Sequence, residues 1–97
     1  MAMVKVLQER VVRRDDADKL MQGLQDLRAA ALGQPGYVTG ETWFKGSDPL
    51  TAVVVATWVS EEHWKAWETS EARVALNDFI TGLLLEEPRV SVYRMTL

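Results

Sequence analysis

The sequence contains no cysteine and a single histidine among its 97 residues. Without cysteine there is neither a disulfide framework nor a thiolate metal site, and no thiol is present to act as a nucleophile. No group of histidine and carboxylate residues has the spacing of metal ligands, so we predict no metal site. His63 stands beside Glu61, Glu62 and Lys65, and this polar context indicates an exposed side chain.

Motifs for bound nucleotides are also missing. There is no GxGxxG segment and no phosphate-binding loop, so nothing in the sequence indicates a flavin or a nicotinamide, and we predict no cofactor. Ser60, Ser70 and Ser91 lack a glycine-rich elbow, and the single histidine is remote from most of them. This argues against a hydrolytic triad.

Neither sign of charge dominates, because eleven Lys and Arg against fourteen Asp and Glu give a formal net charge of -3. Nucleic acid is therefore not an expected partner, since it requires a basic face. The longest apolar runs are far shorter than a membrane span, so no membrane partner is expected. The first residues, MAMVKVLQERVV, lack the apolar core and cleavage site of a signal peptide. We expect a cytoplasmic protein.

The sequence does contain enough apolar residues for a core. They make up 47% of the chain, and charged residues make up 26%, which is typical of a globular protein. A chain of this length is expected to form a single domain over residues 1–97. Because so small a domain buries only about 60 to 65% of the surface that its unfolded chain exposes, a partner subunit would add to its stability.

The first third of the chain predicts a strand followed by a helix. Residues 4–12 are rich in β-branched side chains, which favours a strand. From Ala17 onward, apolar residues recur three or four positions apart, which predicts a helix with Asp15 as its N-cap. Gly33 and Pro35 end this helix. The predicted apolar stripe consists of Ala17, Leu20, Met21, Leu24, Leu27 and Ala31.

The remainder predicts two strands, two helices and a last strand. Residues 37–45 alternate between the two faces of a strand, and residues 51–59 are almost continuously apolar, as in a central strand covered on both faces. Ser60 and Ser70 each precede acidic residues and are predicted N-caps of a short and a longer helix. Residues 89–96 alternate again as a strand. The longer helix has a predicted apolar stripe of Ala72, Leu76, Phe79, Ile80, Leu83 and Leu84.

This order of elements is β-α-β-β-α-β with a divided second helix, which predicts an α+β, ferredoxin-like sandwich. Its helices cover one face of a four-stranded antiparallel sheet. The strand at residues 51–59 is apolar on both faces, so we expect the second face to be covered as well. A second copy of the chain, packed sheet against sheet, would cover it as a homodimer.

Three of the four tryptophans lie within TWVSEEHWKAW, residues 57–67. Trp64 and Trp67 are three positions apart, so they share a helix face that is expected to pack onto the sheet. Trp58 ends a buried strand as a core residue or a dimer contact. The same three side chains are also candidates for a binding site, and the sequence leaves both interpretations open.

Three segments carry a resemblance to a known family. QPGYVTGETW, ATWVSEEHWKAWETSEAR and LLLEEPRVSVY resemble the antibiotic biosynthesis monooxygenase domain family. The resemblance implies a dimeric α/β barrel. Some members of that family oxidise polycyclic anthrones or quinols with O2 and no cofactor, some cleave haem, and many have no known substrate.

The resemblance therefore implies a cofactor-independent monooxygenase acting on a small polycyclic aromatic substrate. One alternative is a non-catalytic module of the same fold that binds a small aromatic molecule. Another is haem binding or degradation, for which family members use a histidine on the long helix and an asparagine on the first strand. Asn77 stands at the histidine position, and Glu9 or Arg10 stands at the asparagine position, so only Trp67 matches the haem-cleaving pattern.

The candidate site residues follow from this proposed chemistry. Indole N–H and amide groups donate hydrogen bonds without carrying charge, which suits a developing enolate or peroxide. Glu9, Glu41 or Arg73 are candidates for acid-base or anion-stabilising help. The predicted catalytic residues are Trp67, Asn77 and Trp58, and the predicted substrate-binding residues are Tyr37, Trp43, Phe79 and Arg73.

Overall fold

The computed structural model describes residues 2–96 and confirms the predicted α+β class. The elements are β1 (Val4–Val11), the 3-10 helix η1 (Arg14–Asp16), α1 (Ala17–Ala31), β2 (Tyr37–Lys45), β3 (Asp48–Trp58), α2 (Glu61–Glu68), α3 (Glu71–Thr81) and β4 (Arg89–Arg94). Within this part of the chain, no helix is long and apolar enough to cross a membrane.

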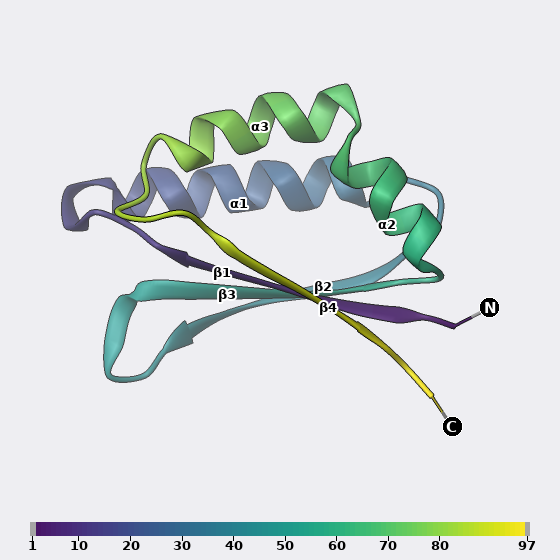
Figure 1. Ribbon diagram of the computed structural model, residues 1–97. Coiled ribbons are helices and arrows are strands. Elements are labelled where there is room, and N and C mark those ends of the chain that lie inside the picture. The colour runs from purple at the N-terminus through teal and green to yellow at the C-terminus, as the bar shows by residue number, and fades with distance from the viewer. Residues whose placement is uncertain (1, 97) are drawn as a thin grey trace.

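The strands form one antiparallel sheet in the order β2-β3-β1-β4 over residues 2–96. The helices lie together on one side of this sheet (Figure 1). β3 is a central strand, as its apolar sequence predicts, and it is paired with β1 on one side and β2 on the other. This is the ferredoxin-like arrangement expected from the order of elements.

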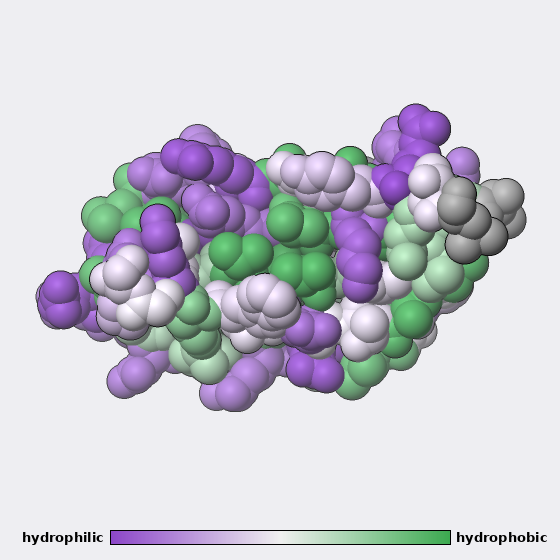
Figure 2. Space-filling model, turned by 90° about the horizontal axis from the view of Figure 1, so that it is seen from below, coloured by the Kyte–Doolittle hydropathy of each residue, from purple (hydrophilic) through white to green (hydrophobic). Residues whose placement is uncertain are grey.

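The two faces of the sheet differ in what covers them. On β1, Val4, Val6, Gln8 and Arg10 point toward the helices and are buried. The opposite face lies outside the helical layer, so helices of the same chain cover only one face of β3. Figure 2 views this open face and shows a hydrophobic centre with hydrophilic side chains around it.

The core between sheet and helices divides into two clusters. One lies toward the α2 end of the sheet and contains Val4, Val6, Ala31, Ala56, Trp58, Trp64 and Trp67. The other joins α1, α3 and the sheet and contains Val12, Leu20, Leu24, Ala52, Ile80, Leu83 and Leu84. Burial of these side chains is the main driving force for folding, at about 25 cal/mol for each Å² of apolar surface removed from water.

Two of the three predicted helix N-caps are present in the structure. Ser60 Oγ accepts the His63 backbone N–H at the start of α2, and Ser70 Oγ accepts the Arg73 backbone N–H at the start of α3. The prediction of Asp15 as the cap of α1 was wrong. The chain first forms η1, which shifts the cap to Asp16, and that side chain makes no capping hydrogen bond.

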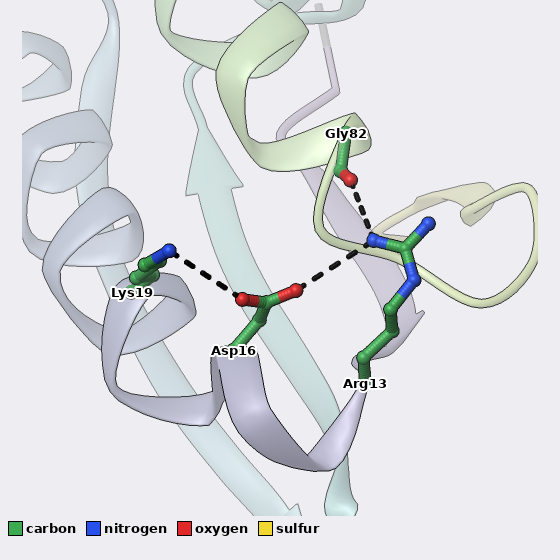
Figure 3. Close-up of polar contacts among 4 residues, drawn as sticks. All are labelled: Arg13, Asp16, Lys19 and Gly82. Atoms are coloured by element: carbon green, nitrogen blue, oxygen red, sulfur yellow. Dashed lines mark hydrogen bonds and ion pairs between the residues drawn. The ribbon is translucent and has the colours of Figure 1, made fainter.

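Asp16 makes ion pairs instead of capping the helix (Figure 3). Its carboxylate lies 3.6 Å from Arg13 Nη1 and 3.7 Å from Lys19 Nζ. The same Nη1 of Arg13 donates to the Gly82 carbonyl at the end of α3, at 2.8 Å. Arg13 therefore joins the end of β1 to the C-terminus of α3, where a cation also favours the helix dipole.

Candidate functional site

A cavity of about 50 Å³ lies between the helical side of the sheet and the helices. Its wall combines apolar side chains from α1 and β3 with a group of aromatic side chains and three arginines. The residues that matter for its chemistry are Gln8, Arg10, Tyr37, Trp58, Trp64, Trp67 and Arg73.

The aromatic part of the wall is centred on Trp58 at the end of β3. The rings of Trp64 and Trp67, both from α2, have centroids 6.2 Å from that of Trp58. Tyr37, at the start of β2, meets the Trp58 ring edge-on at 5.3 Å. These separations are typical of favourable aromatic pairs. As the three-residue spacing of Trp64 and Trp67 predicts, both are buried on the sheet side of α2.

The polar part of the wall is centred on Gln8. Its side-chain oxygen Oε1 accepts a hydrogen bond from Arg10 Nη2 and another from Arg73 Nη2, each at 3.1 Å. Arg10 Nη2 also lies 3.3 Å from Asn77 Oδ1. One neutral amide oxygen on β1 thus holds two guanidinium groups, one from β1 itself and one from α3.

Both guanidinium groups are buried without a carboxylate partner. Arg10 is 2% exposed and Arg73 is 7% exposed, and among residues 2–96 neither forms an ion pair with Asp or Glu. Burial, together with repulsion from Arg73, lowers the pKa of Arg10 to about 10. Burial also lowers the pKa of Arg73. At neutral pH both remain protonated.

Arg73 is better accommodated than Arg10. Its guanidinium carbon lies 5.3 Å from the centroid of the Trp64 ring, a cation–π contact. Its Nη1 donates to the Glu68 carbonyl at 3.4 Å. By contrast, Arg10 Nε and Trp58 Nε1 are buried N–H donors without an acceptor in the described part of the chain.

Tyr37 lies over a glycine. A Cβ added at Gly40 would come 2.5 Å from the Tyr37 hydroxyl oxygen, so β2 needs glycine there to admit this side chain. Burial raises the pKa of Tyr37, and the positive charge of Arg28 partly opposes that shift. Arg28 and Glu41 are exposed and complete the cavity wall.

The structure brings together four of the seven predicted site residues as cavity lining, namely Trp58, Trp67, Tyr37 and Arg73. Asn77 is not part of that wall, and its contact with the site is through Arg10.

Trp43 and Phe79 lie away from the cavity, and they are 60% and 56% exposed. Trp43 lies opposite Val53 on the open face of the sheet, where its Nε1 donates to Glu41 at 2.8 Å.

The orientation of α3 explains the position of Phe79. The predicted stripe is partly wrong, because Ala72 and Phe79 are exposed and Arg73 is buried, whereas Ile80 is buried as predicted. The helix is rotated so that Arg73 reaches Gln8 and Asn77 reaches Arg10. The spacing of apolar residues alone does not predict these hydrogen bonds between α3 and β1.

Gln8 and Arg10 were missed as site residues. A signal was present, because residues at positions 4, 6, 8, 10 and 12 share one face of a strand. In this chain those residues are Val, Val, Gln, Arg and Val. A glutamine and an arginine inside an otherwise apolar series indicate a polar group directed at the core.

His63 lies outside the cavity wall and is half-buried rather than fully exposed as predicted. Its Nδ1 lies 2.6 Å from Ser60 Oγ. Its ring covers Gly36, a residue with a φ of +83°. The packing of α2 against the turn before β2 therefore accounts for its position.

The chain matches one family model, described as antibiotic biosynthesis monooxygenase, over residues 3–78. No protein of curated function matches the sequence. Solved structures share the fold at low sequence identity.

A conserved protein from Methanosarcina mazei is 16% identical with a TM-score of 0.93, covering 99% of this chain and 95% of its own. SnoaB, a cofactor-independent oxygenase from Streptomyces nogalater, is 14% identical with a TM-score of 0.88, covering 100% of this chain and 98% of its own. A conserved protein of unknown function from Bacteroides thetaiotaomicron is 17% identical with a TM-score of 0.88, covering 97% and 98%.

Proposed function

The chain belongs to the antibiotic biosynthesis monooxygenase family, and from that premise we propose that it oxidises a small, flat aromatic molecule of the anthrone or quinol type with O2 and without a cofactor. The observation that carries the proposal is a cavity walled by Trp58, Trp64, Trp67 and Tyr37 and supplied with buried N–H donors. SnoaB, which shares the fold, is described as a cofactor-independent oxygenase.

The overall reaction is balanced without an external reductant. The CH2 group of an anthrone becomes a carbonyl, one oxygen atom of O2 enters the product, and the other leaves as water with the two hydrogens. The substrate supplies all the electrons once it has lost a proton to form an enolate. The protein's contribution is to bind the ring and to stabilise negative charge on oxygen.

The residues of the cavity suit this task. The tryptophan rings provide apolar surface against which a flat ring can pack. The unpaired N–H of Trp58 is available to donate to an anionic oxygen. Asn77 does not line the cavity itself. Its Oδ1 accepts a hydrogen bond from Arg10 and so helps to orient that guanidinium group.

A polycyclic substrate requires the cavity to widen. Pockets that enclose drug-sized ligands have volumes of roughly 300 to 1,000 Å³, whereas the cavity measures about 50 Å³. We expect this widening at the edge strand β2 and at Arg28 on α1, where the cavity wall is exposed.

Oxygen uptake with a soluble anthrone tests the proposal. Wild type should consume O2 well above the buffer rate, with the activity retained after metal chelation. Trp67→Phe should reduce kcat by about tenfold or more, because it removes part of the aromatic wall that stacks on Trp58. Phe79→Leu alters an exposed aromatic side chain on α3, outside both the cavity and the open face, and should keep the wild-type rate. A strict requirement for added flavin would overturn the proposal.

One observation favours a second candidate, a binding module that does not transform its ligand. Among the described residues that line the cavity, Glu41 is the single carboxylate, and it is exposed and hydrogen-bonded to Trp43. A general base is therefore not evident beside the aromatic wall. This candidate predicts a ligand that quenches tryptophan fluorescence and is recovered unchanged, with no O2 uptake.

We also propose that the protein works as a homodimer joined through the open face of the sheet. Val53 and Val55 on β3 lie on this face together with Trp43, and they are only half-buried in the single chain. Figure 2 shows the hydrophobic centre of this face, with hydrophilic side chains along much of its border. An apolar patch inside a polar rim is typical of a protein–protein contact.

A further inference from the structure

We infer that the cavity binds its ligand through a carboxylate that lies between the guanidinium groups of Arg10 and Arg73. The inference rests on the proposed function in one respect: it takes the ligand to be the substrate. The substrate would then be an aromatic molecule that enters the site as an anion. It can be tested by binding alone.

The charge of the site is the first support. Burying an ion in a protein interior is costly unless an opposite charge and hydrogen bonds offset the lost hydration. Here two arginines are buried side by side and share one neutral acceptor, Gln8 Oε1. The wall of the cavity holds three arginines, Arg10, Arg28 and Arg73, but a single carboxylate, Glu41. The charge of Glu68 acts on Arg73, and a ligand carboxylate would supply the counter-charge that Arg10 lacks.

The geometry of the donors is the second support. The Nη2 atoms of Arg10 and Arg73 both donate to the planar amide oxygen of Gln8 at 3.1 Å. The two guanidinium groups are therefore already directed at one sp² oxygen. Carboxylate oxygens have the same planar geometry, and the planar fork of a guanidinium group matches them with two parallel hydrogen bonds. Further hydrogen bonds hold the two groups in place, from Arg10 Nη2 to Asn77 Oδ1 and from Arg73 Nη1 to the Glu68 carbonyl.

The unpaired polar atoms are the third support. Arg10 is 98% buried, since its exposed fraction is 2%, yet its Nε has no acceptor within the described residues. The Nε1 of Trp58 is likewise buried and unpaired. Both are donors, so the group that complements them accepts hydrogen bonds. A carboxylate offers about four acceptor sites and no donor.

The rest of the cavity wall is aromatic, which indicates that the ligand carries an aromatic ring beside its carboxylate. Trp58, Trp64 and Trp67 lie next to the arginine pair in the same cavity, so an acid attached to a flat ring would contact both parts. Arg73 already lies over the Trp64 ring, which places charge and apolar surface within one contact of each other. Benzoate is a small probe of this class, for which the cavity of about 50 Å³ also has to widen. Benzamide is its neutral match in shape.

Binding of these two probes tests the inference. Titrations of wild-type protein, followed by tryptophan fluorescence and by calorimetry, should give a Kd for benzoate at least about tenfold below that for benzamide, because the ionised acceptor makes stronger hydrogen bonds. Arg10→Met and Arg73→Met should each weaken benzoate binding about tenfold or more and leave the weak benzamide binding unchanged. Arg14→Met, the same change at an exposed arginine of η1, should leave both unchanged.

Equal affinity for benzoate and benzamide in wild type would overturn the inference, and that comparison needs no variant to fold. An unchanged benzoate affinity in a folded Arg10→Met protein would overturn the role of Arg10. The two proposals fail separately. Benzoate binding without O2 uptake from any anthrone removes the oxygenase and keeps the carboxylate site, whereas O2 uptake without a preference for benzoate does the reverse.

Discussion

At Arg10 a guanidinium group lies in the core with an amide, rather than a carboxylate, as its main partner. Its lowered pKa means that the charged form is less favourable in the folded protein than in the unfolded chain. Residues that serve binding at the expense of folding are common in functional sites. Arg10 is expected to be one of them.

Arg10→Met should therefore leave the free energy of unfolding at pH 7 equal to that of wild type or above it. Methionine keeps much of the side-chain length and removes the buried charge, while the loss of the hydrogen bonds to Gln8 and Asn77 offsets part of the gain. Urea denaturation of both proteins measures the difference. A loss of more than about 2 kcal/mol would mean that the charge supports the fold.

The same pair of proteins predicts a pH dependence. Because burial lowers the pKa of Arg10 from its ordinary value to about 10 in the folded protein, the unfolded chain binds more protons than the folded protein above this pH. The stability of wild type should rise relative to Arg10→Met as pH increases above about 10, by at most about 1.4 kcal/mol per pH unit. Denaturation at two alkaline pH values measures this change, and a gap that stays constant would contradict it.

Gly36 is the second residue considered, because its position in the structure requires glycine. Its φ is +83°, and an added Cβ would come 2.6 Å from two carbon atoms of His63. Gly36→Ala should lower the free energy of unfolding by about 1 to 2 kcal/mol or more, because both the backbone and the packing are strained. Gly46→Ala is the control, since nothing lies within 4 Å of its Cβ position. Equal losses for the two variants would show that the turn tolerates alanine.

At the scale of elements, α2 depends on its N-cap. Ser60 is buried, and its Oγ contacts both the backbone N–H and the Nδ1 of His63. Ser60→Ala should cost about 1 kcal/mol of stability, which thermal unfolding can measure. Ser91→Ala, on the exposed edge strand β4, should change stability by less than about 0.5 kcal/mol. A Ser60 variant as stable as the Ser91 variant would contradict the capping role.

The elements themselves were largely predictable from the sequence, because apolar periodicity and capping residues act locally. The serines before α2 and α3 cap as predicted. The rotation of α3 was not predictable, since Arg73 is buried by a hydrogen bond to Gln8, which is 65 residues away in the sequence. The cap of α1 was missed because the chain forms η1 before the helix begins.

The candidate site was predictable only where aromatic residues mark it. Trp58 and Trp67 were identified as candidates and line the cavity, since large side chains at the end of a buried strand and on one helix face tend to meet. Trp43 has the same residue type but lies on the other face of the sheet. A bulge between Tyr37 and Thr39 shifts the register of β2, and such a shift reverses which side chains face the core.

The open face of the sheet leads us to predict that two copies of the whole molecule associate. Val55→Glu would place a charge at the apolar centre of that face and should convert the proposed homodimer to a monomer, because an unpaired buried charge is costly. Sedimentation equilibrium measures the change. Val74→Glu is the control, since Val74 is exposed on α3, on the far side of the helical layer. A wild-type monomer, or a dimer that persists in the Val55 variant, would contradict this arrangement.

The architecture as a whole places an aromatic wall and a pair of buried cations in one cavity between the sheet and the helices. β1 and β3 bring Arg10 and Trp58 to the same face of the sheet, and α2 and α3 add Trp67 and Arg73 from above. These elements come from both halves of the chain, so the site exists only in the folded protein. Its proposed use is oxidation of a bound aromatic molecule by O2.

The most direct test of this account is to incubate the protein with an anthrone under isotopically heavy oxygen gas and to analyse the product by mass spectrometry. We expect a quinone that forms faster than in buffer and carries one heavy oxygen atom, with the rate reduced in Trp67→Phe. Formation of quinone at the buffer rate, or with no dependence on Trp67, would contradict it.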